Sequence, residues 1–329
     1  MQTLQVHLAQ DFCVVTGANM GDALSFSEEL EFDDTYELSP QAKTHALVLD
    51  SGQDGHFEIA KGSPLGTPGH RVIVDSCLTF MSAGGGTIEM LVLVEIDGLG
   101  DVSGLYARAL APLAPRTDYT LVGVDTDHAR AKFAQIACVS FSRGTRITLA
   151  TGAQTPIENL QVGDRVLTRD DGPRPVRWIG SSTARATGDL APVRIRKGAL
   201  NNSDDLVVSP DHRLFIYQRS DALGAGRHEI LVRARHLVNG DTITQEDGGF
   251  IDYFQLLFDH HQIIYAEGIA AETLLVDTRT RGALPADLAD AIENALPDHA
   301  QRPHLEFEVA QSLLDHPNMA EILRRASTS

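Results

Sequence analysis

The chain has 329 residues and a formal net charge of −18. This length accommodates two or three domains with hydrophobic cores, and the acidity disfavours nucleic acid as a partner because the phosphates would be repelled. The longest apolar run near the middle of the chain, residues 90–94, has the length of a buried strand, so we expect no membrane span. Residues 1–7 lack the basic and apolar regions of a secretory signal, which leaves the cytoplasm or export by a signal-peptide-independent route.

Cysteine usage argues against disulfides and against a metal centre. Cys13, Cys77 and Cys138 are odd in number and widely spaced, so neither a disulfide framework nor a Cys-x-x-Cys site is indicated. The acidic run at residues 28–34 lacks the spacing of a calcium loop. The sequence therefore predicts no metal and no cofactor, and nothing in it indicates an oligomeric state.

Residues 1–130 have the pattern of short strands separated by turns. Apolar and β-branched runs recur between Gly, Pro, Asp or Ser residues, at 12–15, 46–49, 71–74 and 87–96. This spacing predicts a β-sandwich or barrel-like module, whose role the sequence does not indicate. A linker at residues 131–139 follows, and the segment 129–136 leading into it is expected to form either a short helix or an extended arm.

Two short alternating segments joined by a glycine turn begin at Ser140. Residues 140–145 read SFSRGT, and Gly163 and Asp164 close the second segment. This order resembles the opening of a Hint domain, the self-processing fold shared by hedgehog C-terminal domains and inteins. The resemblance implies a Cys or Ser at the first position, whose side chain attacks the preceding peptide bond.

Two candidate nucleophiles lie two residues apart. The family pattern places the nucleophile four residues before the glycine of Gly-Thr, and counting back from Gly144 gives Ser140. Cys138 is out of frame, although a thiol is intrinsically the better nucleophile. We prefer Ser140, because position in the fold decides the geometry of attack before the pKa does.

A second motif follows at Ser209 and His212. The run 206–216 resembles the Thr-x-x-His motif of Hint domains, with serine in place of threonine. In the family, the histidine protonates the amide nitrogen that must leave and the hydroxyl helps to hold the peptide. An imidazole suits this role, since it exchanges protons near neutral pH. The alternative is a histidine that caps the turn after Pro210.

The run 254–268 resembles the closing strands of the Hint fold, where an aspartate and a histidine precede a turn. Adjacent side chains on a strand point to opposite faces, so His260 and His261 cannot both enter one site. We assign the site position to His260, with Asp259 orienting the region. A metal site built from His212, His260 and a carboxylate lacks local ligand spacing.

One departure from the intein pattern limits the expected reaction. Splicing inteins end in His-Asn followed by Cys, Ser or Thr, whereas residues 271–274 read AETL. Without that asparagine, splicing is not expected. The resemblance then implies only the first half of the mechanism, an N–O (or, from Cys138, N–S) acyl shift and cleavage by water or a small-molecule nucleophile.

The resemblance therefore implies a mostly β protein with a Hint-like antiparallel domain at residues 140–280. Residues 281–329 have apolar residues at helical spacing and are expected to form a short helical C-terminal extension, as is common in bacterial Hint-domain proteins. Two other functions stay open. One is an inactive Hint-fold structural or interaction module that is not cleaved, and the other is a hydrolase acting on other molecules, for which no catalytic triad can be placed.

Overall fold

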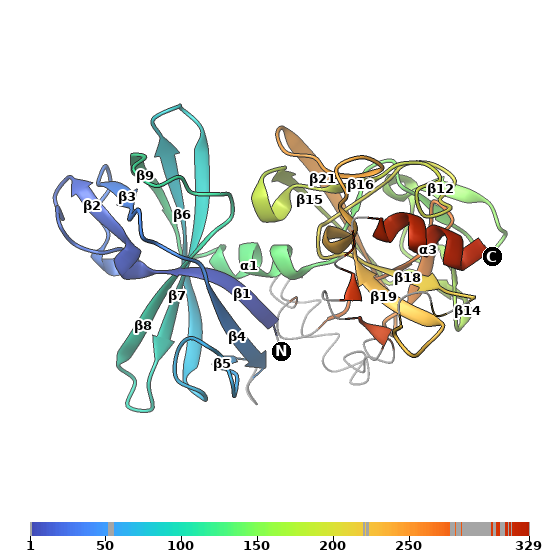
Figure 1. Ribbon diagram of the computed structural model, residues 1–329, viewed down its shortest axis with the longest axis horizontal. Helices are drawn as coiled ribbons and strands as arrows, with labels where there is room; N and C mark the ends of the chain where they lie inside the picture. Colours follow the sequence, from blue (N-terminus) through green and yellow to red (C-terminus); the bar gives the residue numbers. More distant parts are fainter. Residues whose placement is uncertain are drawn as a thin grey trace. The chain divides into compact units, whose positions relative to one another are not determined.

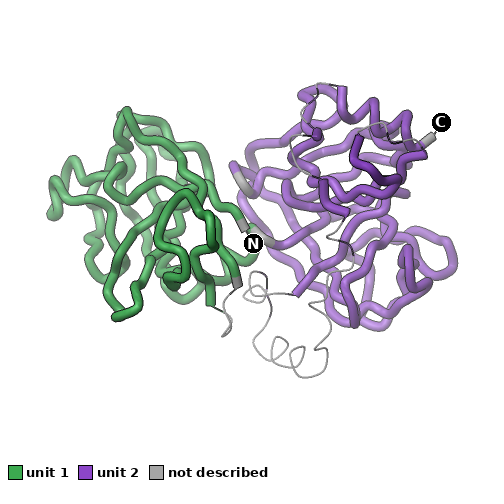
Figure 2. The backbone as a smooth tube through the Cα atoms, turned by 60° about the horizontal axis from the view of Figure 1, so that its bottom comes forward, with its two compact units in different colours: residues 1–136, 281–283 green, residues 137–280, 284–329 purple. Residues whose placement is uncertain are grey.

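The computed structural model describes residues 2–51, 56–219, 221, 224–276, 280, 284, 304, 307–309, 313–314, 316 and 318–328. These residues belong to two compact units, one formed by residues 1–136 and the other by residue 137 onward (Figure 2). Each unit is mostly β. Within the described ranges, no helix has the length and apolarity needed to span a membrane.

The first unit is built from antiparallel strands with bounds β1 Gln2–Leu8, β2 Phe12–Thr16, β3 Thr35–Leu38, β4 His45–Ser51, β5 Phe57–Ile59, β6 Arg71–Ser82, β7 Thr87–Ile96, β8 Val102–Ala109 and β9 Tyr119–Asp125. Strands β6, β5, β4, β1, β8 and β7 pair in that order, and β7 pairs back with β6 (Figure 1). That last pairing closes the sheet, and the barrel-like form of the predicted module is confirmed. Strands β9, β3 and β2 extend the sheet from β6.

A cluster of aromatic rings fills the core of this unit. Phe12 stacks on Tyr36 at 5.2 Å between ring centroids, and Phe80 meets both rings edge-on. Such offset and edge-to-face contacts add to the stabilisation from burial alone. Helix α1, Ala129–Ala137, packs on the same unit through Phe133 against Phe57. Of the two conformations considered for the segment before residue 137, the helix is therefore the one formed.

The second unit contains the strands β10 Phe141–Ser142, β11 Arg146–Thr148, β12 Gln154–Pro156, β13 Arg165–Thr168, β14 Gly172–Pro175, β15 Trp178–Arg185, β16 Val193–Ile195, β17 Leu206–Val208, β18 Arg213–Tyr217, β19 Glu229–Arg233, β20 Ile243–Gln245, β21 Phe250–Leu257, β22 Ile263–Ala266 and β23 Ile269–Glu272. One sheet has the order β15-β21-β10-β17-β16-β20 (Figure 1). The other has the order β12-β11-β22-β23-β18-β19, with β13 paired to β22 and β14 paired to β13. Short 3-10 helices connect strands in both units, at Ala9–Asp11, Ser27–Glu29, Ile157–Asn159, Gly188–Leu190 and Ala234–Leu237.

The C-terminal helix α3, Met319–Thr328, belongs to the core of the second unit. Met319, Ala320 and Leu323 are buried in the same apolar cluster as residues from both of its sheets. The predicted helical extension is confirmed at this helix, whereas the segment 285–296 lies outside the described residues. Helix α3 therefore completes the domain instead of trailing from it.

We predict that Leu323→Ala lowers the free energy of unfolding of the second unit by about 2–5 kcal/mol, because it removes a fully buried leucine from the apolar cluster. Trp178 is the only tryptophan in the chain and lies in this unit, so its fluorescence during urea unfolding reports on this unit. Val162→Ala is the control, since Val162 is 66% exposed. Equal unfolding midpoints for the two variants would show that α3 does not stabilise the unit.

Candidate functional site

Ser140 lies between two strands that are distant in sequence. It directly precedes β10, and Phe141 of β10 pairs with Val208 of β17 and with Phe254 of β21. In this antiparallel register, Ser140 lies directly opposite Ser209 on one side and Gln255 on the other. Phe141 is buried in the apolar core, and side chains alternate along an extended chain, so the Ser140 side chain points to the opposite face of the sheet.

The hydroxyl of Ser209 contacts the chain on both sides of the Val139–Ser140 peptide bond. The backbone N–H of Ser140 donates to Ser209 Oγ at 3.0 Å, and Ser209 Oγ donates to the carbonyl oxygen of Cys138 at 3.3 Å. The backbone N–H of Ser209 donates in turn to the carbonyl oxygen of Ser140 at 2.9 Å. One side chain thus holds the peptide segment that the sequence singled out.

His212 lies against the same segment. Its Nδ1 is 3.1 Å from the carbonyl oxygen of Ser140, and its ring packs edge-on against Phe141. Since a carbonyl oxygen only accepts, this hydrogen bond requires the proton on Nδ1. The His212 side chain is fully buried, and burial lowers the pKa of the imidazole to about 4, although the charge of Glu272 acts in the opposite direction. His212 is therefore neutral at pH 7.

The structure brings Ser140, Ser209 and His212 into contact, and it also places Cys138 next to Ser209. Cys138 is fully buried and reaches Ser209 through its backbone carbonyl group. The contact with the Ser140 hydroxyl oxygen comes from a residue that the sequence did not single out. Gln255 Nε2 donates to Ser140 Oγ at 2.8 Å, from β21.

Asp259 and His260 are not among the hydrogen-bond partners described for Ser140, Ser209 and His212. Asp259 forms a two-point salt bridge with the exposed Arg177, which lowers the pKa of the Asp259 carboxyl. His260 is exposed, and His261 is the buried member of the pair. The structure thus differs from the prediction, because His261 and not His260 takes the inner position. The reason is that β21 ends at Leu257 and β22 begins at Ile263, so both histidines lie in a turn where strand alternation does not apply.

A buried ion-pair network adjoins His212. Arg213 Nη1 is 3.0 Å from Glu272 Oε1, Arg213 Nε is 3.2 Å from Glu308 Oε2, and His261 Nε2 is 3.3 Å from Glu272 Oε2. Burial alone would raise the pKa of the Glu272 carboxyl, but the charge of Arg213 lowers it well below its usual range. Through Glu308, the C-terminal segment supports the strand that follows His212.

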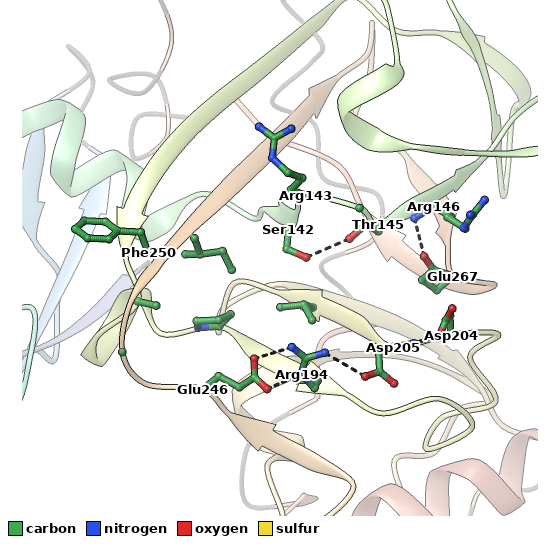
Figure 3. A pocket seen from close by; sticks show the side chains of 16 residues that line it. Ser142, Arg143, Thr145, Arg146, Arg194, Asp204, Asp205, Glu246, Phe250 and Glu267 are labelled. Carbon is green, nitrogen blue, oxygen red and sulfur yellow. Dashed lines mark hydrogen bonds and ion pairs between the residues drawn. The ribbon is translucent and has the colours of Figure 1, made fainter.

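A pocket of about 470 Å³ lies near the start of β10, and Ser140 itself does not line it (Figure 3). Ser142 and Ile251 line it, and by strand alternation they share a face with Ser140 and Gln255, respectively. Arg194 pairs there with both Glu246 and Asp205. The lining is mostly polar. Among the described residues, no three His, Cys, Asp or Glu side chains are grouped so that they could hold a metal ion.

The region that begins near Ser140 is similar to a known protein family. The family model of the Hint domain matches residues 139–278. A curated relative, the V-type proton ATPase catalytic subunit of Candida tropicalis, is 33% identical over 92 residues, which are 26% of this chain and 8% of that protein. The chain therefore corresponds to a small part of that relative.

Solved structures similar to this chain include three inteins or intein-like domains. The gp41-1 intein is 15% identical, covers 40% of this chain and 97% of its own, and has a TM-score of 0.26. The TvoVMA intein is 17% identical, covers 41% of this chain and 96% of its own, and has a TM-score of 0.29. The bacterial intein-like domain from Clostridium thermocellum is 16% identical. The match covers 41% of this chain and 97% of that domain, with a TM-score of 0.28.

We predict that the burial of neutral His212 makes the second unit less stable in acid. The unfolded chain takes up this proton near pH 6.5, whereas the folded chain does so only near pH 4. The stability is therefore fully present above pH 6.5 and falls by about 3 kcal/mol as the pH drops to 4. Urea unfolding followed by Trp178 fluorescence between pH 7.5 and 4.5 measures this loss. His212→Asn should lack this part of the pH dependence, and parallel curves for the two proteins would contradict the assignment.

We also predict that Glu272→Gln lowers the free energy of unfolding of the second unit by about 3–5 kcal/mol, because it leaves the buried Arg213 without its closest partner. The matched control is Asp252→Asn, which removes one carboxylate from an exposed pair with Arg143 and should change stability far less. Urea unfolding at pH 7 measures both variants. A loss no greater than that of the control would refute a supporting role for Glu272.

Proposed function

Because this chain contains a Hint domain at residues 139–278, the fold of self-processing proteins, we propose that it cleaves its own backbone before Ser140. The observation that carries the proposal is the arrangement around the Val139–Ser140 bond. The amide N–H of Ser140 contacts Ser209 Oγ at 3.0 Å, and His212 Nδ1 lies 3.1 Å from the carbonyl oxygen of the same residue. A nucleophile and a hydroxyl group at the leaving nitrogen thus meet at the Val139–Ser140 bond, and an imidazole contacts the next peptide group, through the carbonyl oxygen of Ser140.

The proposed reaction has two steps. In the first, Ser140 Oγ attacks the carbonyl carbon of Val139, the C–N bond to Ser140 breaks, and the hydroxyl proton is transferred to the nitrogen, which leaves an ester and a free amine. In the second, water attacks the ester carbon, takes the acyl group from Oγ and returns a proton to Oγ. The products are residues 1–139 with a terminal carboxyl group and residues 140–329 with a free amino terminus.

His212 has to move for the first step. Its Nδ1 proton is directed at the carbonyl oxygen of Ser140, while the atom that needs a proton is the nitrogen of the same residue. In the proposed step, the ring or the peptide shifts so that Nδ1 comes within hydrogen-bond reach of the Ser140 nitrogen. General acid assistance of this kind typically contributes about 10²- to 10⁴-fold to a rate. Ser209 Oγ, already in contact with the nitrogen, keeps the leaving group in place.

Cleavage without splicing is the proposed outcome. After β23, which ends at Glu272, the chain continues with Thr273 and Leu274 and offers no asparagine to cyclise. For the second step we propose water or another small nucleophile. A large acceptor is disfavoured, because Ser140 itself is only 2% exposed.

The alternative is a Hint fold that has kept its structure and is not cleaved. One observation favours it: the side chain at Ser140 Oγ is the amide of Gln255, which cannot take the hydroxyl proton. In that case the domain would serve as a structural or interaction module.

We predict that the purified protein, incubated near pH 7 with hydroxylamine, splits into fragments of about 15 and 21 kDa, since 35.6 kDa is divided 139:190. Intact-mass spectrometry identifies the fragments and the hydroxamate on Val139. Ser140→Ala should abolish cleavage, and His212→Ala should slow it about 10²- to 10⁴-fold.

Ser181→Ala is the matched serine control, because Ser181 is exposed on β15. An amino-terminal fragment that lacks Cys138 and Val139, lost in Cys138→Ala, would identify the thiol as the nucleophile instead. Full mass in every sample, with and without hydroxylamine, would refute self-cleavage and favour the uncleaved module.

A further inference from the structure

The side chain of Gln255 is placed on the reacting oxygen. Its Nε2 donates to Ser140 Oγ at 2.8 Å, and both residues are buried, with exposed fractions of 6% and 2%. The two positions are 115 residues apart and meet because β10 pairs with β21. In such a buried position, a hydrogen bond is better defined than on the surface, since few water molecules compete for its donor and acceptor.

The neighbouring strand fixes the Gln255 amide group. Gly180 of β15 pairs directly with Gln255. A Cβ atom at Gly180 would lie 2.7 Å from Gln255 Oε1 and 2.1 Å from Trp178 Cη2, so the absence of a side chain makes room for both groups. The Gln255 amide and the Trp178 ring thus both lie in the space that a side chain at position 180 would occupy.

The chemistry of an amide decides what this contact does. A serine oxygen has two lone pairs and one proton. Gln255 occupies one lone pair and leaves the other for attack on Val139, so it fixes the direction of the nucleophile. An amide does not accept a proton near neutral pH, however, and His212 Nδ1 is already protonated and directed at the carbonyl oxygen of Ser140. No base therefore contacts Ser140 Oγ among the hydrogen bonds described for it.

We propose that Gln255 is a further catalytic residue, which fixes Ser140 Oγ for attack and, because it cannot take the hydroxyl proton, keeps the acyl shift slow. This inference rests on the proposed cleavage before Ser140. It makes opposite predictions for two substitutions at one position. Removal of the donor should slow the reaction, whereas a basic group in the same place should accelerate it.

The first test measures the rate of hydroxylamine-dependent cleavage by intact mass in three proteins. Gln255→Leu should be about tenfold slower than the wild type, because one hydrogen bond to the oxygen is lost. Gln255→His should be about 100-fold faster, with a rate that rises with pH through the pKa of the new imidazole, which takes the proton from Oγ and passes it to the leaving nitrogen. A merely structural role of Gln255 would not produce this pH profile.

Gln262→Leu is the matched control. Gln262 is equally buried, and its Nε2 donates to Asp171 Oδ2 over the same 2.8 Å, but its partner is not Ser140. It should cleave at the wild-type rate. Wild-type rates and pH profiles in both Gln255 variants would overturn the inference, while loss of cleavage in Ser140→Ala would still support the proposed function.

The second test does not depend on wild-type cleavage. In Ser140→Cys, the difference in thiolate absorbance near 240 nm against Ser140→Ala gives the pKa of the new thiol. Adding Gln255→Leu should raise that pKa by about one unit, which is a tenfold loss of thiolate at a given pH, because a donor to the anion is removed. If Ser140→Cys cleaves itself during purification, its cleavage rate with and without Gln255→Leu replaces the titration.

The two tests separate the two proposals. A shifted thiol pKa in a protein that never cleaves would refute the proposed function and keep the assignment of Gln255 to the Ser140 oxygen. An unchanged pKa, or an unchanged rate where the thiol cleaves, would refute the assignment.

Discussion

The hydroxyl group of Ser209 holds the backbone on both sides of one peptide bond, and the rest of the site depends on this contact. A hydroxyl has a single proton and two lone pairs. Ser209 uses its proton on the carbonyl oxygen of Cys138 and a lone pair on the N–H of Ser140. Ser209 and Ser140 are 69 residues apart in the chain and meet only because Phe141 pairs with Val208. A one-residue slip of that register would turn Ser140 into the core and Phe141 out of it.

The second interaction that the site depends on is the burial of the neutral His212. A buried ion pair between Arg213 and Glu272 lies beside it. Glu272 and Arg213 are each nearly inaccessible to water, so each needs the other to remain charged. Glu308 adds a second carboxylate to Arg213, and the backbone next to it bonds to β19. The C-terminal segment is consequently part of the domain that carries the site.

The sequence predicted those parts of the site that local spacing determines. Ser209 and His212 are three residues apart in a turn closed by the hydrogen bond from the His212 N–H to the carbonyl oxygen of Ser209. Gly144, with its φ of 87°, marks the turn that sets the frame for Ser140. The barrel-like form of the first unit could not be separated from a sandwich, because the difference is the non-local pairing of β7 with β6.

Gln255 and the buried His261 were missed for related reasons. The partner of Ser140 Oγ depends on which strand lies beside β10, and nothing near Gln255 in the sequence specifies that neighbour. The alternation used to choose between His260 and His261 is valid within a strand, and both residues follow the end of β21. Side chains therefore alternate between the two faces up to the end of β21 but not in the turn that follows it.

Taken together, the contacts of Ser140 describe a well-satisfied ground state. Its N–H, its carbonyl oxygen and its hydroxyl oxygen each have a hydrogen-bond partner, from Ser209, from His212 and from Gln255. Buried polar groups that are all paired favour one arrangement of the chain. These contacts favour the intact chain, and the proposed cleavage requires His212 to exchange its contact with the carbonyl oxygen of Ser140 for one with the nitrogen. In the proposed reaction, the same hydrogen bonds that position Ser140 Oγ would also restrain it, so the proposed rate of cleavage depends on how readily this one contact is exchanged.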